Sequence, residues 1–342
     1  MYFDSRVGVV IRCLRAVASN QVARLAPRFY LNVTSQTGRG SHVETVKEVA
    51  DYFFECFDDY FRKLGVPRED ITAYLSGKSV LEYGPGDLPG VGMLMYAHGA
   101  EKVICVDRFS MVSINQKNTQ ILENIISRLD GEALERVMSC FNDFGEISSG
   151  FAENRICYYI HPNGLSGLKN SVDLVYSRAV LEHVNDLYAT FLDMASALKT
   201  GGTAIHKVDL KSHGLHEKNP LDFLVWPTRL WNLMYAHKGA PNRWRLNKYL
   251  EVIEMIPVDT ILIEATELAA ESDVDNIGPY LAKPFQEVSK EDLAWLGFWL
   301  VLRKSDGSAM RNVQDVSSNI KEPLINSGRA DVIFDSRMPA MN

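Results

Sequence analysis

Residues 79–108 constrain the fold of this 342-residue chain more than any other stretch. An apolar run is followed by Gly84 and Gly86, then by an apolar helical segment and a second apolar run that ends at Asp107. Glycines let the chain turn sharply after a strand, so that a ligand can lie against the backbone and the start of the next helix. The pattern predicts a strand–helix–strand unit that binds a nucleoside cofactor, with Asp107 placed to hold a ribose.

The spacing of the glycines separates two classes of cofactor. A dinucleotide fingerprint, G-x-G-x-x-G/A, that begins at Gly84 requires Gly or Ala at position 89, and this chain has Pro89. NAD is therefore disfavoured. An acid stands on each side of the glycines, Glu82 in the first apolar run and Asp107 at the end of the second.

Residues 82–86, EYGPG, resemble the cofactor loop of the class I S-adenosylmethionine (SAM) methyltransferases. The resemblance implies that Glu82 helps to hold the amino-acid part of SAM and that Gly84 and Gly86 lie against the ligand. It also implies that Asp107 binds both ribose hydroxyls. The cofactor that we expect is therefore SAM.

The resemblance covers about residues 79–208 and departs from the family at Leu88, where many members have a third glycine. It implies an α/β fold with a doubly wound, seven-stranded sheet of the class I methyltransferase type. Together with the hydrophobic pattern it gives four expected regions: a helical N-terminal cap (1–78), a SAM-binding domain (79–304), a lid inserted at about 211–257, and a C-terminal tail (305–342).

The hydrophobic pattern also predicts individual elements. Apolar residues at helical spacing predict an amphipathic helix over 43–64, and we expect it to form the cap together with a first helix. Further helices are expected at 114–137, with a break at 130–131, and at 179–199, with a stop at 201–202. The strands expected after the second are 155–160, 172–177, 203–208 and an antiparallel pair, 260–264 and 295–302.

The segment 173–184, DLVYSRAVLEHV, resembles the part of the family that flanks the transferred methyl group. Tyr176, Ser177 and Arg178 end the fourth predicted strand, so we expect them near the sulfonium of SAM. The ring face of Tyr176 could contact that cation, an interaction of about 0.5–2 kcal/mol. His183 follows one helical turn later, where we expect it to pack a helix.

The family resemblance implies that the adenine contacts come from the loop after the third strand. His161, Pro162 and Asn163 are the candidates, with Asn142 and Asp143 as competitors from the preceding segment. An Asn can satisfy both the donor and the acceptor of an adenine edge, although Asn-Gly is also a common turn. The cofactor-binding residues that we expect are Glu82, Tyr83, Gly84, Pro85, Gly86, Asp107, Arg108, Asn142, His161, Asn163, Ser177 and Arg178.

Three polar residues, His206, Asp209 and His213, follow each other at the end of the fifth predicted strand. A histidine there can act as a general base, because its pKa lies near working pH, and Asp209 could orient it. With Tyr176 they are the catalytic candidates. The H-x-x-D-x-x-x-H spacing also permits metal ligation, but hydrogen-bonded loop histidines are commoner, so we expect no metal.

The predicted lid carries Asn242, Arg243 and Arg245. Their side chains could grip a carboxylate or phosphate of the substrate. Alternatively, they pair with acids of the main domain and hold the lid down.

Composition excludes several classes of function. A formal net charge of −7 disfavours a nucleic-acid partner, so we expect a small-molecule substrate. No apolar run is long enough for a bilayer, so we expect no membrane partner. Five scattered cysteines fit a reducing cytoplasm rather than a disulfide framework. The Arg-rich N-terminus also fits an organelle presequence, but we interpret it as a first amphipathic helix.

We therefore predict a cytoplasmic SAM-dependent methyltransferase of small-molecule metabolism, with a homodimer as the oligomer to test. In an alternative, the amino nitrogen of SAM attacks its own γ-carbon, which gives azetidine-2-carboxylate and methylthioadenosine; Tyr176 and Asn142 would then position the sulfonium and the amine. A third hypothesis is a non-catalytic SAM-binding protein. The motifs do not decide between them, and methyl transfer is the commonest activity on this fold.

Overall fold

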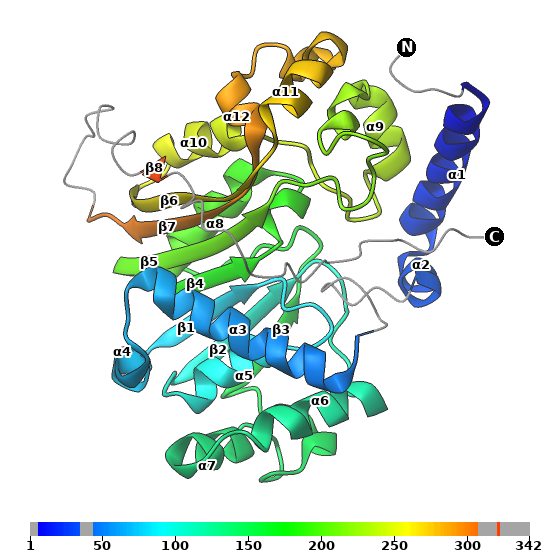
Figure 1. Cartoon of the computed structure of the whole chain (residues 1–342). Helices are drawn as coiled ribbons and strands as arrows, with labels where there is room; N and C mark the ends of the chain where they lie inside the picture. The colour runs from blue at the N-terminus through cyan, green and yellow to red at the C-terminus, as the bar shows by residue number, and fades with distance from the viewer. Residues whose placement is uncertain (1–5, 35–43, 307–319, 322–342) are drawn as a thin grey trace.

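The computed structural model describes residues 6–34, 44–306 and 320–321. The fold is of the α/β class, and at its centre lies an eight-stranded sheet in the order β3-β2-β1-β4-β5-β7-β6-β8 (Figure 1). Strands β1 to β5 are parallel, and β7 runs antiparallel to both β5 and β6. The strands are β1 (Ser79–Tyr83), β2 (Lys102–Asp107), β3 (Ile156–Ile160), β4 (Val172–Arg178), β5 (Leu198–Asp209), β6 (Val258–Leu268), β7 (Trp295–Lys304) and β8 (Ile320–Lys321).

The seven predicted strands and the late antiparallel pair are confirmed. The two-residue strand β8 was not predicted; it lies at the edge of the sheet, beside β6, within the segment that we expected to be a tail. The rest of that expected tail, from residue 307 on, lies outside the described residues.

Helices cover both faces of the sheet. The described α-helices are α1 (Arg6–Leu25), α2 (Pro27–Thr34), α3 (Val46–Leu64), α4 (Ile71–Leu75), α5 (Gly90–Ala97), α6 (Gln116–Ile126), α7 (Gly131–Ser139), α8 (Leu187–Ala197), α9 (Thr228–Tyr235), α10 (Leu246–Glu254), α11 (Glu271–Ile277) and α12 (Lys290–Ala294). One core cluster joins α3, α5 and α6 to one face, and a second joins α8 and α10 to the other. This is the doubly wound arrangement that the sequence predicted.

The predicted helix over residues 43–64 is α3, which starts at Val46. Thr45 accepts a hydrogen bond from the Glu48 amide, and the Glu48 carboxylate accepts one from the Thr45 amide. Such a capping box satisfies amides that the first turn would leave unpaired. Gly65 ends the helix in the left-handed conformation, with φ 72°.

The predicted helix over residues 179–199 forms only in part. Its first residues make an irregular turn with a short 3₁₀ segment, η3 (Leu181–His183), and α8 begins at Leu187. Asp186 caps α8 by accepting a hydrogen bond from the Ala189 amide at 2.9 Å. The predicted stop at 201–202 lies inside β5.

The expected cap and lid are arranged differently from the prediction. Helix α3 packs on the sheet, whereas α1 packs beside α9, where Asn20 donates to the Leu233 carbonyl at 2.9 Å (Figure 1). Parts of the insertion join α1, α11 and α12 in a third core cluster. The end of the insertion, α10, instead belongs to the core of the sheet.

Candidate active site

The turn between β1 and α5 requires its glycines. Gly84 and Gly86 have φ values of 64° and 72°, which L-residues with a Cβ rarely adopt. A Cβ on Gly84 would also lie 2.6 Å from Cγ2 of Val180, in the segment after β4. The turn therefore packs tightly against that segment, and both come together at the carboxyl ends of β1 and β4.

Glu82 lies at the centre of this edge. It is 8% exposed, and its Oε2 accepts hydrogen bonds from Oη of Tyr176 at 3.1 Å and from Sγ of Cys105 at 3.6 Å. Burial raises the pKa of Glu82 from 4.5 to about 7, although both hydrogen bonds lower it. A cationic ligand beside Glu82 would favour the ionised carboxylate.

Asp107 closes β2, the strand next to β1. Its Oδ1 accepts hydrogen bonds from the backbone amides of Arg108 at 2.6 Å and of Phe109 at 3.1 Å, which fix the carboxylate at the end of the strand. Burial raises the pKa of Asp107, and the two amides lower it. The guanidinium of Arg108 lies over the Phe109 ring, 4.7 Å from its centroid.

Two of the expected adenine contacts lie beside Asp107. The His161 amide donates to the Asp107 carbonyl at 2.9 Å, and the Asn163 amide donates to Nδ1 of His161 at 3.4 Å. Both side chains are exposed. Asn142 belongs to another turn, where its amide group donates to the Ser149 carbonyl at 2.7 Å.

The other expected cofactor residues around β1 and β4 point in different directions. Tyr83 is turned to the face of α8, and its hydroxyl donates to Asp193 at 2.6 Å. Ser177 is turned to the same face. Arg178 points to the face of α3 and forms an ion pair with Asp59 at 3.0 Å. Of these residues, only Arg178 has its side chain on the face that Glu82 shares.

The expected contact of the Tyr176 ring with a sulfonium is not supported. The side chain is fully buried, and its ring packs edge-on against Tyr60 with centroids 5.3 Å apart. Its hydroxyl donates to Glu82. Tyr176 therefore orients the Glu82 carboxylate.

The structure does not support the expectation that His206 acts as a general base. Alternation along β5 turns its side chain into the core on the α8 side, where it is 1% exposed. Its Nδ1 lies 2.7 Å from Oγ of Ser177 and its Nε2 lies 3.0 Å from Sδ of Met194. Burial lowers the pKa of His206 to about 3. The expected partner, Asp209, accepts a hydrogen bond from the Lys211 amide instead, at 2.9 Å.

The lid arginines are held by the backbone. Arg243 and Arg245 are buried, and their guanidinium groups donate to backbone carbonyls rather than to acids of the main domain. Arg243 donates to Trp226 at 2.6 Å, and Arg245 donates to Leu210 at 2.9 Å. Both residues tie separate segments of the chain together.

Asn242 is a structural residue as well. Its side chain donates to the Leu181 carbonyl at 2.9 Å and to the Val184 carbonyl at 3.2 Å. Its amide donates to the Glu182 carbonyl at 2.6 Å. The residue therefore fastens the insertion to η3.

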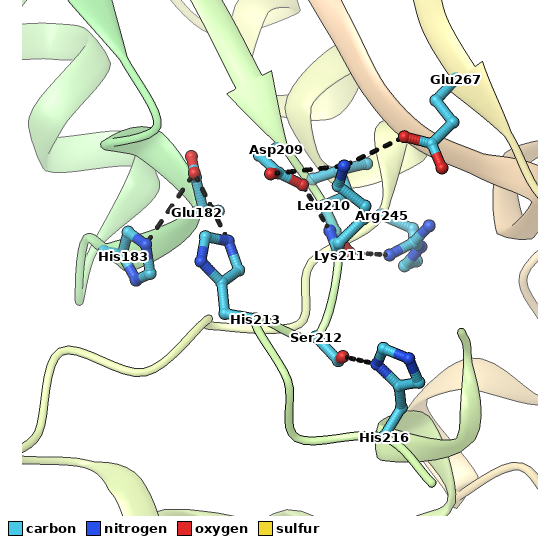
Figure 2. Close-up of polar contacts among 10 residues, drawn as sticks. All are labelled: Glu182, His183, Asp209, Leu210, Lys211, Ser212, His213, His216, Arg245 and Glu267. Atoms are coloured by element: carbon cyan, nitrogen blue, oxygen red, sulfur yellow. Dashed lines mark hydrogen bonds and ion pairs between the residues drawn. The ribbon is translucent and has the colours of Figure 1, made fainter. Parts of the chain in front are cut away.

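A polar cluster that the sequence analysis missed lies beyond the ends of β4 and β5. Figure 2 shows the imidazoles of His183 and His213 directed at the carboxylate of Glu182. Nε2 of each histidine lies 3.9 Å from Oε1 of Glu182. Glu182 is 1% exposed. His183 does not pack a helix as expected, because η3 ends the segment before α8 begins.

The titration properties of the cluster follow from its burial. Burial is the main cause that raises the pKa of Glu182 well above its ordinary value, and the charge of Asp209 is the second. Burial is also the main cause that lowers the pKa of His183 to about 3, with the nearby His213 as the second cause. Burial lowers the pKa of His213 as well. Both histidines are therefore neutral at pH 7, with a lone pair on each ring.

Lys207 is a second residue that the sequence analysis missed. It follows His206 in β5 and so points to the face of α3, where its Nζ lies 5.7 Å from the Trp299 ring centroid. Burial, followed by the charge of Arg178, lowers the pKa of Lys207 to about 8. No sequence motif marks such a lysine, because its environment comes from α3 and β7.

The chain has matches among known protein families and solved structures. A family model described as a methyltransferase domain matches residues 60–260. The chain is similar to the structure of an S-adenosylmethionine-dependent methyltransferase from Mesorhizobium loti, at 16% identity, with 67% of this chain and 92% of that chain covered and a TM-score of 0.39. It is similar to geranyl diphosphate methyltransferase in complex with SAM at 12% identity, with 69% and 83% covered and a TM-score of 0.37. No curated protein matches.

Proposed function

We propose that this chain, which belongs to the methyltransferase-domain family, transfers the methyl group of SAM to a small-molecule acceptor. One observation carries the proposal. The carboxylates of Glu82 and Asp107 lie on adjoining strands beside a turn whose glycines, Gly84 and Gly86, have positive φ. SAM offers groups that match these residues, an ammonium for Glu82 and two ribose hydroxyls for Asp107.

SAM, when bound, supplies a methyl group on a positively charged sulfur that a nucleophile can displace. The chain has mainly to bind and align the reactants, which can account for several kcal/mol of the barrier. Glu82 would hold the ammonium in the orientation that Tyr176 and Cys105 fix. Asp107 would accept hydrogen bonds from the ribose, and His161 and Asn163 would border the adenine.

The acceptor would bind beyond β4 and β5, where an open α/β sheet commonly holds its ligands. We propose that His213, Asp209 and Lys207 are polar residues of this pocket. The cluster of α1, α9, α11 and α12 would cover the pocket as a lid. The free thiols of the five cysteines support a reducing cytoplasm as the compartment. Within residues 6–34, 44–306 and 320–321, no helix has the length and apolar character needed to cross a membrane.

Calorimetric titration of SAM into the wild type and Asp107→Ala tests the cofactor site. Two hydrogen bonds to a charged acceptor are worth about 1.5–3 kcal/mol each, so we expect the affinity of the variant to fall at least about 100-fold. Asp70→Ala removes an exposed carboxylate before α4 and should bind SAM like the wild type. Equal affinity of Asp107→Ala and the wild type would reject the assignment.

Mass spectrometry after incubation with SAM separates the remaining alternatives. Methyl transfer predicts stable SAM until a small-molecule acceptor is added, and then S-adenosylhomocysteine with a methylated product. Methylthioadenosine and azetidine-2-carboxylate from SAM alone would instead establish the cyclase. Binding without turnover across a metabolite extract would favour the non-catalytic protein.

A further inference from the structure

We propose that Glu182, His183 and His213 form a binding site for one divalent transition-metal ion, with Zn²⁺ as the probe. Each residue offers one ligand atom, and these atoms lie within 4.8 Å of one another (Figure 2). Two imidazole nitrogens and one carboxylate oxygen form a ligand set that Zn²⁺ and its neighbours in the first transition row accept. This site differs from the H-x-x-D-x-x-x-H set that the sequence permitted, because His206 lies elsewhere in the core and Glu182 and His183 take part instead.

The distances fit a shared ion better than direct hydrogen bonds. Both Nε2 atoms lie 3.9 Å from Oε1 of Glu182, whereas hydrogen bonds between nitrogen and oxygen span about 2.7–3.2 Å. Ligands about 2.1 Å from a tetrahedral ion lie about 3.4 Å apart. The two separations from Oε1 exceed this value by about 0.5 Å, and the three ligand atoms all lie within 4.8 Å of one another. Side-chain movements of roughly 0.5–1 Å would therefore complete the site.

The carboxylate of Glu182 supplies an independent observation. Among the described residues, neither of its oxygens has a hydrogen-bond partner, although the side chain is 1% exposed. A buried carboxylate without a partner costs several kcal/mol. A bound cation would compensate that cost directly.

The ring nitrogens of the two histidines are largely free to take a ligand. Nδ1 of His183 is buried and has no hydrogen-bond partner among the described residues. Ligating histidines usually donate their second nitrogen to an acceptor, and for His213 the Asp209 backbone is such an acceptor. Nε2 of His213 has no hydrogen-bond partner among the described residues.

The backbone also holds the cluster in place. His213 has φ 52°, a conformation that costs a residue with a Cβ about 1–3 kcal/mol and that directs its ring toward η3. The side chains of His183 and His213 are 25% and 28% exposed, so an ion can enter from solvent. Three protein ligands would leave a coordination position open, as in catalytic zinc sites.

A role for the ion rests on the proposed function. Val180, two residues before Glu182, packs against Gly84 of the cofactor turn, so the cluster borders the proposed acceptor pocket. An ion there could bind an acceptor hydroxyl and lower its pKa. Metal binding itself depends on neither SAM nor an acceptor.

The test uses the full chain after removal of metals with a chelator. Zn²⁺ is titrated calorimetrically, and Co²⁺ is followed by its visible absorption bands. We expect one ion per chain, and for Glu182→Gln and His213→Ala an affinity lower by on the order of 100-fold or more, since even second-shell changes cost 10–100-fold. His237→Ala removes an exposed histidine outside the cluster and should bind like the wild type.

Wild type that binds no ion, or Glu182→Gln that binds Zn²⁺ as tightly as wild type, would overturn the proposal. Glu182→Gln preserves the shape of the side chain, and circular dichroism checks that it folds. SAM titrations of the same samples separate the two proposals. Failure of the metal site leaves SAM affinity intact, whereas failure of the SAM site leaves the Zn²⁺ titration unchanged.

Discussion

Glu82 and Glu182 are both buried glutamates near the carboxyl ends of adjacent strands, but their surroundings differ. Glu82 accepts hydrogen bonds from Tyr176 and Cys105. Glu182 faces two histidines at 3.9 Å and has no hydrogen-bond partner among the described residues. The protein itself supplies hydrogen-bond donors to the Glu82 carboxylate. The Glu182 carboxylate has no such donor in the part of the chain that the structure describes, and for this reason we assign it to a metal ion.

The largest expected effect is on the free energy of unfolding, which should depend on pH through the ionisation of Glu82. Its folded pKa of about 7 lies above its ordinary value of 4.5, so the folded protein binds more protons between these pH values than the unfolded chain. The stability that this proton contributes is present below pH 4.5 and is lost as pH rises to about 7. The difference corresponds to about 3 kcal/mol.

Urea unfolding of the wild type and Glu82→Gln at pH 5 and pH 8 measures this contribution. The variant cannot ionise at this position, so we expect it to be more stable than the wild type at pH 8 by about 3 kcal/mol and similar at pH 5. Glu69→Gln, an exposed control, should follow the wild type at both values. If Glu82→Gln had the same pH profile as the wild type, Glu82 would not be the buried acid described above.

A smaller effect tests the turn that Glu82 precedes. Gly84 and Gly77 both have positive φ, 64° and 69°, but only at Gly84 would a Cβ meet another side chain, that of Val180. Gly77→Ala should therefore cost only the backbone strain of roughly 1–2 kcal/mol. Gly84→Ala should cost about 1–3 kcal/mol more from overpacking and should weaken SAM binding.

Thermal unfolding and SAM titration of both glycine variants measure the effect of the close contact between Gly84 and Val180. Because the strain is shared, the difference between them reports the contact of the turn with the segment that leads to Glu182. Equal stability and equal SAM affinity of the two variants would show that the turn and that segment are not packed as described.

The same comparison explains what the sequence could predict. The cofactor turn depends on local signals, two apolar runs, glycines and an acid at each strand, all within residues 79–107. These signals predicted β1, α5 and β2. They needed no knowledge of distant contacts, because the glycine conformations and strand ends are properties of neighbouring residues.

The cluster of Glu182, His183 and His213, by contrast, depends on contacts between segments that are distant in the sequence. Residues 179–186 were predicted to be helical from their apolar spacing, but Ala179 adopts φ 52° and Asp186 starts α8 later. His206 was misassigned because its side chain lies on the face of β5 that carries the core residues Ala204 and Val208, whereas Lys207 and Asp209 lie on the other face. Arg245 was expected to grip a substrate anion or to pair with an acid of the main domain. In the structure it lies in the core, where the carbonyls of Leu210, Leu293 and Trp295 accept hydrogen bonds from its guanidinium.

The smallest expected effect comes from a substitution that leaves Glu82, like Glu182, with fewer hydrogen-bond donors. Tyr176→Phe removes one hydrogen-bond donor from the Glu82 carboxylate, which should raise its pKa further, because that hydrogen bond lowers it. A neutral hydrogen bond contributes about 0.5–1.5 kcal/mol, so SAM affinity at pH 7 should fall about 3- to 10-fold. The loss should shrink at pH 9, where the carboxylate is ionised in both proteins. Calorimetry at the two pH values measures this, with Tyr188→Phe as the exposed control. A loss of equal size at both pH values would mean that Tyr176 acts through packing rather than through the charge of Glu82.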